Sequence, residues 1–493
     1  MQLKALLSAA ATTFVDGPVD REITSIAYDS RRVEPGALFV ALKGEKSDGS
    51  EFIAQAVERG AAAIVSEHGQ VKTAATSVVV PNARLALADL AAAFFQHPSR
   101  FLKIAGVTGT NGKTTTAFLI KHICDHMQLR CGLLGTVRYE IGERILPAAR
   151  TTPESLDLQD LLWQMRSAGC KAAAMEVSSH AISQSRIRGV EFDAAVFTNL
   201  TQDHLDYHGT MDAYFEAKAA LFTGLGAQSK KKARAIINSD DRFGAQLIIR
   251  LRGDVPVTTF GVGVHADFRA SNVRTDFHGS SYQLDAGGRS FLVRLPLIGM
   301  FNVYNSLSAI AAANAIGADI RSAVLALANA PAVPGRLQPV PAQRQFRVFV
   351  DYAHTDDALL NVIKTCRELQ PGRVIVVFGC GGNRDKTKRA RMGAVVDEYA
   401  DFGIVTSDNP RKEDPAAIVE DIKPGMKRGR YEVVLDRREA IFRAIALAQP
   451  RDIILIAGKG HENTQEFADQ IVPFDDVAVA TQALEGKRVE LDR

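Results

Sequence analysis

A glycine-rich loop between a strand and a helix carries the clearest chemistry in this 493-residue chain. It runs from Gly106 to Thr114 with the sequence GVTGTNGKT, between buried-type residues 102–107 and a helical pattern over 115–127. Small residues let backbone N–H groups approach phosphate oxygens, and the helix N-terminus adds a positive dipole end. In such a loop Lys113 reaches the β- and γ-phosphates of a nucleotide, and the Thr114 hydroxyl ligates Mg²⁺. The strict pattern has glycine six residues before the lysine, where this chain has valine, so the loop is a variant.

Polar side chains also stand at the ends of two other buried-type strands. Glu176 lies in the segment MEVSSH, and a second segment, 198–208, holds two Asp and two His within six residues. The carboxyl ends of strands form the ligand crevice of an open α/β sheet, and carboxylates there suit magnesium. On its own, Glu176 is more often an ordinary polar strand end, and no cysteine supports a zinc site.

Three blocks of secondary structure must position these residues. Residues 1–97 alternate short strands and helices, and the sequence His97–Arg100 then breaks the pattern. Residues 98–332 alternate buried-type strands with helices, which predicts a mostly parallel sheet wrapped by helices, with an antiparallel insertion over 268–295. Residues 333–493 follow the Pro- and Gly-containing segment 331–335 and repeat the alternation as a Rossmann-like, doubly wound unit. The fold class is therefore α/β with three domains.

The periodicity predicts the main elements of each block. Expected strands are 23–28, 38–42, 62–65, 78–80, 102–107, 172–177, 194–198, 235–238, 348–352, 374–378, 404–406, 433–435 and 453–457; expected helices include 52–59, 83–96, 115–127 and 358–369.

Composition excludes several classes of protein. Lys plus Arg number 59 and Asp plus Glu 56, so the formal charge of +3 gives no electrostatic case for a nucleic-acid partner. No apolar run approaches the roughly 18 residues that span a bilayer. The acidic residues Asp16 and Asp20 disfavour a secretory signal at the N-terminus. Five scattered cysteines without a CxxC pair are typical of a reducing compartment, so we expect a cytoplasmic protein.

Taken together, the motifs resemble the ATP-dependent Mur ligases, which build the peptide stem of peptidoglycan. The shared sequences are GVTGTNGKTTT, AMEVSSHA, FTNLTQDHLDYHG, GMFNVYN, PGRLQ, VDYAHT and AGKGHE, and they lie between Gly106 and Glu462. Each motif is weak alone, whereas the set is specific. Within the family, the segment Asp408-Asn409-Pro410-Arg411 most resembles the member that adds meso-diaminopimelate to UDP-N-acetylmuramoyl-L-alanyl-D-glutamate.

The resemblance implies a reaction in two steps and a role in cell-wall biogenesis, cell shape and cell division. ATP phosphorylates the side-chain carboxylate of D-glutamate, and an amine of diaminopimelate attacks the acyl phosphate, so that ADP and phosphate leave. Phosphorylation is needed because a carboxylate is a poor acyl donor. Mg²⁺ and Lys113 offset the repulsion between the carboxylate and the γ-phosphate. A monomer that acts on small molecules, without a membrane span, is expected.

The same resemblance implies the catalytic and nucleotide-binding residues. Thr114 and Glu176 take a first Mg²⁺, and His204 with a carbamylated Lys218 supports a second. Carbamylation converts a cation to an anion; without the resemblance, a helical lysine is more often a solvated residue. The catalytic residues are thus Lys113, Glu176, His204 and Lys218, and the ATP-binding residues are Gly109, Thr110, Asn111, Gly112, Lys113, Thr114, Thr115, Asn302, Asn305, Arg336 and Asp351.

The nucleotide dipeptide is expected to bind along the first two blocks. Arg186 can hold a carboxylate or pyrophosphate bidentately. Arg188 can do the same, and spacing does not choose between them. The expected contacts are Tyr28, Ser30, Glu45, Lys46, Ser47, Thr151, Thr152, Ser178, Gln184 and Arg186.

The third block is expected to select the amino acid. Diaminopimelate carries a distal zwitterion, which requires a forked cation and at least one anion, and Arg411 suits the distal carboxylate. Relatives that add lysine lack this arginine, because a buried unpaired guanidinium is costly. The expected contacts are Arg384, Asp408, Asn409, Pro410, Arg411, Gly458 and Glu462.

Other features of the charged segments are expected to be structural. We expect Lys388, Arg389 and Arg391 to be solvated at a helix start, and Lys230–Lys232 to lie in a solvated loop. Asp356 replaces the proline that is usual in this family, and aspartate is also favoured at a helix start.

Three alternatives stay open. A ligase that adds D-alanyl-D-alanine, or a folate polyglutamate synthase, shares the scaffold, but the segment 408–411 argues against both. A P-loop motor that binds nucleic acid is supported only by the basic runs near 230 and 384, and the net charge argues against it. A non-enzymatic nucleotide-binding module is the third.

Overall fold

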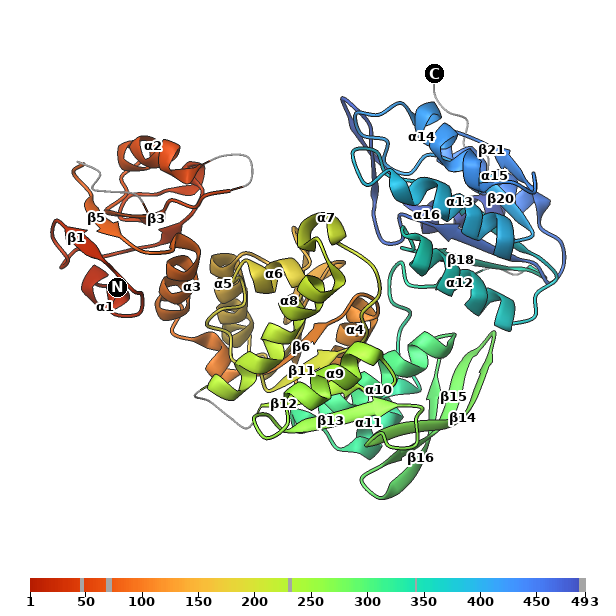
Figure 1. Cartoon of the computed structure of the whole chain (residues 1–493), viewed down its shortest axis with the longest axis horizontal. Coiled ribbons are helices and arrows are strands. Elements are labelled where there is room, and N and C mark those ends of the chain that lie inside the picture. The colour runs from red at the N-terminus through yellow and green to blue at the C-terminus, as the bar shows by residue number, and fades with distance from the viewer. Residues whose placement is uncertain (45–47, 68–72, 229–232, 342–343, 487–493) are drawn as a thin grey trace. The chain divides into compact units, whose positions relative to one another are not determined.

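The computed structural model describes residues 1–44, 48–67, 73–228, 233–341 and 344–486. The chain forms two compact units, one of residues 1–266 with 308–323 and one of residues 267–307 with 324–493. Both units are α/β, and three parts of the chain contain a parallel or mixed sheet (Figure 1). The predicted fold class is therefore confirmed. No helix in the described part of the chain is long and apolar enough to cross a membrane.

The first unit begins with a five-stranded sheet in the order β1-β5-β4-β3-β2. All neighbours are parallel except β1 and β5. Alternate side chains of the strands enter two cores, so that α1 and α3 cover one face and α2 covers the other (Figure 1). The elements are α1 (Leu3–Leu7), β1 (Phe14–Asp16), β2 (Ile26–Ala27), β3 (Leu38–Val40), α2 (Ile53–Glu58), β4 (Ala63–Ser66), β5 (Thr76–Val79) and α3 (Ala83–Phe94).

The second sheet of this unit has the order β13-β12-β11-β6-β10-β7-β8-β9. It is parallel from β13 to β7, and β8 and β9 add an antiparallel edge. Since β6 lies between β10 and β11, the loops that leave these three strands meet at one edge of the sheet. The strands are β6 (Lys103–Thr108), β7 (Cys131–Leu134), β8 (Arg138–Ile141), β9 (Arg144–Pro147), β10 (Ala172–Glu176), β11 (Ala194–Phe197), β12 (Arg234–Asn238) and β13 (Val257–Gly261).

Helices cover this sheet, and α5, α8 and α9 share a hydrophobic core with it. The helix α4 packs against β6, β7 and β10. The helices are α4 (Lys113–His126), α5 (Ser155–Ser167), α6 (Ser179–Ser183), α7 (Leu205–His208), α8 (Met211–Thr223) and α9 (Arg242–Arg250).

The second unit contains an antiparallel meander and a doubly wound sheet. The meander is β14 (Phe268–Asp276), β15 (Gly279–Ala286) and β16 (Arg289–Leu295), which confirms the predicted insertion. Two helices, α10 (Met300–Ala315) and α11 (Ile320–Leu327), follow the meander in the chain.

The doubly wound sheet has the order β17-β18-β22-β19-β20-β21 and is parallel except for β17. Residues of α12, α13 and α14 join the core on one face, and those of α15 and α16 join the core on the other. The elements are β17 (Gln338–Val340), β18 (Arg347–Asp351), α12 (Asp356–Glu368), β19 (Val374–Phe378), α13 (Thr387–Tyr399), β20 (Phe402–Val405), α14 (Pro415–Ile422), β21 (Tyr431–Val433), α15 (Arg437–Leu447), β22 (Ile453–Ala457), β23 (Thr464–Glu466), β24 (Ile471–Pro473) and α16 (Asp476–Glu485).

Some local expectations need correction. The strand expected over 23–28 is reduced to Ile26–Ala27, and the break at 97–100 is a short 3₁₀ helix, Pro98–Phe101. Asp356 stands at the start of α12 as expected, next to the capping residue Thr355, whose side chain accepts from the N–H of Ala358. The expected solvated loop Lys230–Lys232 lies outside the described residues.

Candidate active site

The phosphate loop leaves β6 at Thr108 and enters α4 at Lys113. Gly109 has φ = +148°, and a Cβ there would lie 1.9 Å from the Thr198 hydroxyl, so only glycine fits. That hydroxyl donates to the carbonyl of Asn111 at 2.6 Å, and the side chain of Asn199 accepts from the N–H of Asn111 at 2.9 Å. Residues at the end of β11 therefore hold the loop in place, so the motif after β11 and the glycine-rich motif form one site.

Two lysines converge on this loop. Lys113 Nζ donates to the carbonyls of Gly109 at 2.9 Å and Thr110 at 2.8 Å. Lys218 is 1% exposed, and its Nζ also donates to the Gly109 carbonyl at 2.9 Å. Burial, and next the nearby charge of Lys113, lower the pKa of Lys218 well below its ordinary value. The solvated-helix alternative for Lys218 is therefore wrong.

Glu176 lies beside the loop at the end of β10 and is 1% exposed. The Thr114 hydroxyl donates to its carboxylate at 3.0 Å, and Thr136 donates through its backbone N–H at 2.8 Å and its hydroxyl at 3.1 Å. A Cβ at Gly135 would lie 2.3 Å from the carboxylate, so the backbone passes close to it. A buried carboxylate paired with a hydroxyl is a set of hard oxygen donors that fits Mg²⁺.

The acidic and histidine-rich segment after β11 forms a ring cluster. The rings of His180 and His204 lie edge to face with centroids 4.9 Å apart, and Tyr207 lies 4.1 Å from His180. Burial is the main cause that lowers the pKa of His204 to about 4, so this imidazole is neutral at pH 7. Across the described parts of the chain, no group of three or more His, Cys, Asp or Glu side chains is arranged to hold a metal ion. A metal site here therefore needs other ligands besides His204.

Residues expected to meet the nucleotide dipeptide lie next to Glu176. The Thr152 hydroxyl donates to the Glu176 carbonyl at 2.9 Å and accepts from the Ser178 N–H at 3.0 Å. The Thr151 hydroxyl lies 3.0 Å from the hydroxyl of Thr136. The structure thus brings Thr151, Thr152 and Ser178 together around the end of β10.

The two candidate arginines differ in their surroundings. Arg186 is 7% exposed and donates to the Thr152 carbonyl at 3.2 Å and to the Gln184 side chain at 2.5 Å. Burial lowers the pKa of Arg186, and Glu154, whose carboxylate lies 3.5 Å from Nε, opposes that shift. Arg188 instead forms a forked ion pair with Asp89, at 2.7 and 3.0 Å. Only Arg186 lies in the cluster with Thr152 and Gln184.

The residues expected at the uridine end lie in the N-terminal sheet region. The Tyr28 hydroxyl donates to Asp157 of α5 at 2.5 Å, and burial together with this bond raises the pKa of Tyr28. The Ser30 hydroxyl donates to Gln55 at 2.6 Å. The other three expected residues, Glu45, Lys46 and Ser47, lie outside the described residues.

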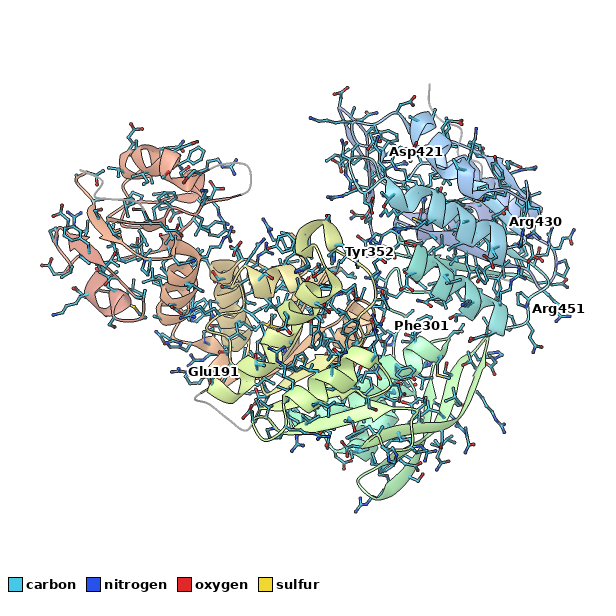
Figure 2. The ribbon with its side chains drawn as sticks, in the orientation of Figure 1. Glu191, Phe301, Tyr352, Asp421, Arg430 and Arg451 are labelled. Atoms are coloured by element: carbon cyan, nitrogen blue, oxygen red, sulfur yellow. The ribbon has the colours of Figure 1, made fainter. Side chains whose placement is uncertain are left out.

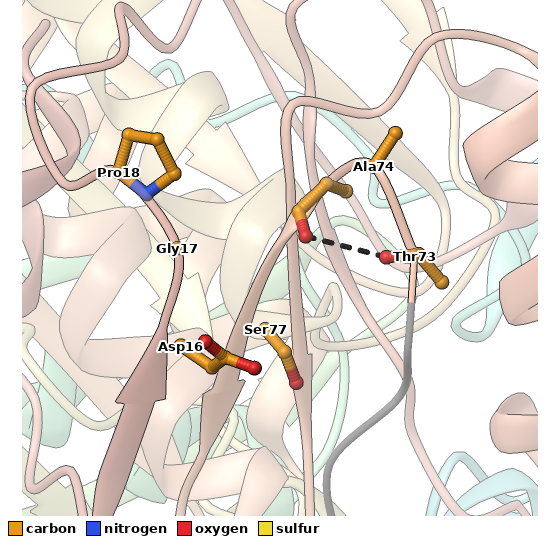
Figure 3. Close-up of a pocket in the computed structure, with 7 residues that line it drawn as sticks. Asp16, Gly17, Pro18, Thr73, Ala74 and Ser77 are labelled. Carbon is orange, nitrogen blue, oxygen red and sulfur yellow. Dashed lines mark hydrogen bonds between the residues drawn. The ribbon is translucent and has the colours of Figure 1, made fainter.

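A separate hollow of about 520 Å³ is lined by the end of β1 with the two residues after it and by the segment that leads into β5 (Figure 3). Neither Tyr28 nor Ser30 lines it, so it is not the predicted uridine site. Its lining residues are Asp16, Gly17, Pro18, Thr73, Ala74, Ala75 and Ser77.

In the second unit, Asn302 and Asn305 share one face of α10, as their spacing predicts. The Asn305 side chain donates to that of Asn302 at 3.1 Å, and Asn302 donates to the Ile298 carbonyl at 2.9 Å. Both are buried, so these amides also fix the start of the helix.

Asp351 and Arg336 lie where β18 ends. The carboxylate of Asp351 accepts from the N–H groups of Leu337 at 2.6 Å and Ala353 at 2.8 Å, and burial raises its pKa. The Arg336 guanidinium lies 4.8 Å from the centre of the Tyr352 ring, which is labelled in Figure 2.

The predicted amino-acid residues gather beyond the ends of β20 and β22. Arg411 has φ = +54°, and its Nε donates to Glu466 at 2.9 Å while Nη1 donates to the Gly382 carbonyl at 2.9 Å. Asn409 donates to Glu462 at 2.8 Å. Gly458 has φ = +116°, and a Cβ there would lie 2.5 Å from the carboxylate of Asp408.

Two further residues predicted to contact the amino acid, Pro410 and Arg384, lie on the loops after β20 and β19. Pro410 lies between Asn409 and Arg411, and its carbonyl would be 1.8 Å from a Cβ at Gly382, so the two loops touch. Arg384 lies on the same loop as Gly382 and is exposed.

The expectation for Arg389 is wrong. Its side chain is wholly buried and pairs with Glu413 at 3.0 Å and with Asp421, labelled in Figure 2, at 2.8 Å. It also donates to the Gly381 carbonyl at 3.3 Å. The physical reason is that carboxylates far along the chain neutralise and hydrogen-bond this cation. The expectation of solvent exposure is met by Arg391, which is exposed and pairs with Asp356 at 3.2 Å.

Several site residues escaped the sequence analysis. Lys459, wholly buried beside Glu462, lies within the motif AGKGHE, so the motif contained the signal. Thr136, Glu413 and Glu466 carry no sequence signal, because each acts on a partner distant in the chain.

A strand–loop–helix phosphate site with a carboxylate beside it, in a chain that ends in a doubly wound unit, defines a P-loop nucleotide-binding α/β enzyme. The chain belongs to the Mur ligase family. Family models match over residues 22–95 (Mur ligase family, catalytic domain), 107–313 (Mur ligase middle domain) and 335–460 (Mur ligase, glutamate ligase domain).

The relatives include UDP-N-acetylmuramoyl-L-alanyl-D-glutamate–2,6-diaminopimelate ligases. The protein of that name from Syntrophomonas wolfei is 45% identical over 492 residues, which cover 99% of this chain and 100% of the relative. The one from Geobacillus thermodenitrificans is 44% identical, with coverage of 99% and 100%. A solved structure of a ligase with this name has a TM-score of 0.71 and 35% identity, and the match covers 99% of each chain.

Proposed function

We propose that this protein is an ATP-dependent ligase that joins meso-diaminopimelate to UDP-N-acetylmuramoyl-L-alanyl-D-glutamate. The products are the nucleotide-linked tripeptide of peptidoglycan synthesis, ADP and phosphate. The observation that carries the proposal is the turn Asp408–Arg411 after β20. It holds the Arg411 guanidinium and the Asp408 carboxylate, and its Asn409 bonds to a second carboxylate, Glu462, after β22. A forked cation with nearby anions is what a distal zwitterion requires. The names of the full-length relatives support the same substrates.

The phosphate loop is proposed to bind ATP and the transferred phosphate. The N–H groups over residues 112–115, at the start of α4, are the proposed donors to phosphate oxygens, whereas those of Thr110 and Asn111 donate to Asn199. Lys113 supplies the positive charge that the transferred group needs, since phosphoryl transfer depends mainly on positioning and charge stabilisation. The buried oxygens of Thr114 and Glu176 would hold Mg²⁺, which when bound offsets the repulsion between the γ-phosphate and the substrate carboxylate.

Lys218 is proposed to act as a carbamate. The neutral amine attacks CO₂, forms an N–C bond and loses one proton to solvent, which leaves one negative charge. Burial and a lowered pKa support this step, because only the neutral amine has the lone pair for it. With the neutral His204, this anion would support a second Mg²⁺.

Asn302 and Asn305 are proposed to bind near the adenine of ATP, and Arg336 and Asp351 near its ribose and phosphates. The nucleotide dipeptide is proposed to bind from Tyr28 and Ser30, with Glu45, Lys46 and Ser47, to the cluster at the end of β10. Arg186, held by Thr152 and Gln184, is the cation of that cluster and suits a carboxylate or pyrophosphate.

For the amino acid, Arg411 and Arg384 are proposed to receive the carboxylates. Asp408, Glu462 and the Gly458 backbone are proposed to receive the ammonium groups. Asn409 and Pro410 fix the turn between them.

The division of labour is proposed to follow three domains: residues 1–97 for the UDP end, 98–332 for ATP and 333–493 for the amino acid. Three hydrophobic cores follow these ranges except at Leu156, which joins the core of the first range, and Ile298, which joins that of the third. We propose that the enzyme is cytoplasmic, because its cysteines are unpaired, as is typical of a reducing compartment. A monomer is proposed as its assembly state.

One assay tests the proposed function. Phosphate release from ATP is measured with the nucleotide dipeptide and, in separate reactions, with meso-diaminopimelate, L-lysine or D-alanyl-D-alanine. Release only with diaminopimelate, and a product of tripeptide mass, is expected. Equal release with lysine would leave only a generic ligase of this family, and release that needs nucleic acid would point to a motor.

A further inference from the structure

Lys459 lies in a turn whose two flanking positions require glycine. It lies between Gly458, with φ = +116°, and Gly460, with φ = +54°. A Cβ at Gly460 would lie 2.7 Å from the Cβ of Tyr352. The backbone is therefore wedged between the ends of β18 and β20, and the side chain of Lys459 is wholly buried.

The buried ammonium joins the two segments assigned to amino-acid binding. Lys459 Nζ donates to Asn409 Oδ1 at 2.9 Å and to Glu462 Oε2 at 3.0 Å. The amide of Asn409 closes a triangle, because its Nδ2 donates to the same Glu462 Oε2 at 2.8 Å. Both bonds reach Oε2, so a ligand ammonium is expected to meet Oε1. Lys459 thus fixes the orientation of the carboxylate without needing to touch the ligand.

The same contact extends to the arginine that is proposed to read the distal carboxylate. Asn409 Oδ1 also accepts from the backbone N–H of Glu466 at 3.0 Å. Glu466 in turn accepts from the N–H of Arg411 at 3.0 Å through its carbonyl, and from Arg411 Nε at 2.9 Å through its carboxylate. A continuous set of hydrogen bonds therefore runs from Lys459 through Asn409 and Glu466 to Arg411.

We propose that Lys459 is a positioning and specificity-determining residue for the amino-acid substrate, an inference that rests on the proposed function. It orients Glu462 and Asn409 and balances the negative charge of Asp408 and Glu462. A pocket without this cation is more negative, so it disfavours a substrate with a distal carboxylate relative to L-lysine, which has only a distal ammonium.

Two other roles for Lys459 fit the structure less well. The Gly-Lys-Gly sequence resembles a phosphate-binding turn, but the ammonium is 0% exposed and bonds to Asn409 and Glu462. A purely structural ion pair would change stability and all kinetic constants together, without changing the choice of amino acid.

The test compares Lys459→Met with the native enzyme in the phosphate-release assay. The KM for diaminopimelate is expected to rise roughly ten- to a hundredfold, as for loss of a buried charge-assisted hydrogen bond. The KM values for ATP and the nucleotide dipeptide are expected to stay unchanged, and the diaminopimelate-to-lysine ratio of kcat/KM is expected to fall. Lys459→Arg, which keeps the charge, is expected to recover part of that ratio. Lys427→Met, which removes an exposed lysine of the same unit, is the matched control and is expected to behave as the native enzyme.

An unchanged ratio in a folded Lys459→Met enzyme would overturn the proposal, as would an equal rise of all three KM values. If Lys459→Met does not fold, Lys459→Gln is used, because it keeps a hydrogen-bond donor without the charge. An unchanged diaminopimelate-to-lysine ratio of kcat/KM in that variant would equally overturn the proposal. A native enzyme that releases no phosphate with diaminopimelate would instead overturn the proposed function itself.

Discussion

Lys113 and Lys218 donate hydrogen bonds to one atom, the carbonyl oxygen of Gly109, at 2.9 Å each. The two ammonium groups are brought together by a glycine whose φ of +148° and tight contact with Thr198 allow no other residue. Two positive charges on one acceptor repel each other, and Lys218 is the buried member of the pair. The site therefore favours one cation, Lys113, and one neutral amine, Lys218, which matches the different roles proposed for them.

Lys113→Ala is expected to abolish ligation, by at least about a hundredfold in kcat, because it removes the charge that faces the transferred phosphate. Phosphate release and thermal unfolding are measured together. Lys103→Ala, at the other end of β6, removes a half-exposed lysine and is the control. Undiminished turnover by a folded Lys113→Ala protein would contradict the assignment of the loop to ATP.

Lys218 is expected to make stability depend on pH in CO₂-free buffer. The unfolded lysine keeps its proton up to about pH 10.4, whereas the folded one loses it at lower pH. Between these two pKa values the unfolded state binds more protons, so the free energy of unfolding rises with pH. Lys218→Met removes this slope and is expected to be the more stable protein at pH 7, with a smaller advantage near pH 10. Urea unfolding measures the difference, and Lys171→Met, which changes an exposed lysine, is the control. An advantage that grows with pH would contradict the assignment.

Carbamylation of Lys218 predicts a second, separate result. Lys218→Ala is expected to lose activity, and short carboxylates are expected to restore part of it by occupying the vacated anion site. In the native enzyme, ¹³C NMR under labelled CO₂ at neutral pH is expected to show a carbamate signal that Lys218→Ala lacks. An active, magnesium-bound enzyme without that signal would show that the amine works unmodified.

The sequence predicted the parts of the site that are continuous in the chain. Gly109 to Thr114 lie on one loop, and a strand–loop–helix pattern places them without further information. Glu176 was expected at the site from the family resemblance, and it lies beside the loop because β10 is adjacent to β6 in the sheet. The partner Thr136 could not be predicted, since the loop after β7 approaches Glu176 only once the strand order is known.

Burial of cations was the least predictable property. Arg389 and Arg391 are two residues apart in a basic run, yet the first is buried and the second exposed. The difference comes from Glu413 and Asp421, which reach Arg389 from other elements. The family motifs predicted Lys218 at the site, and the structure buries it against the phosphate loop, whereas residue type alone predicts a solvated lysine.

Arg437 and Asp476 form an ion pair in which both side chains are 0% exposed. Asp476→Ala leaves the guanidinium buried without its partner and is expected to cost about 3–5 kcal/mol of unfolding free energy. The double variant Arg437→Met/Asp476→Leu removes both charges and is expected to cost much less. Urea unfolding, with hydrogen exchange of α15 and α16, measures both. Equal losses in the single and double variants would show that packing, and not the unpaired charge, dominates.

Arg411 is expected to read the distal carboxylate of diaminopimelate. It follows β20 at the edge of the sheet that also carries Glu462, and its bonds to Glu466 and Gly382 use Nε and Nη1, so that Nη2 is the nitrogen we expect to meet the ligand. Removing one partner of a largely desolvated, forked pair costs roughly a hundredfold in affinity. Arg411→Ala is therefore expected to raise the KM for diaminopimelate by about that factor. Arg411→Lys is expected to recover little, because an ammonium lacks the planar fork.

The KM values for ATP and the nucleotide dipeptide are expected to stay nearly unchanged in Arg411→Ala, since their proposed contacts lie on other segments of the chain. Arg391→Ala removes an exposed arginine of the same unit and is the matched control. L-Lysine is expected to be a poor substrate of the native enzyme, because it has no distal carboxylate to accept from Arg411 Nη2, while Nε stays paired with Glu466. Steady-state kinetics with both amino acids measures this preference. Equal kcat/KM for lysine and diaminopimelate in the native protein would show that Arg411 does not read a carboxylate and would leave only a generic ligase of this family.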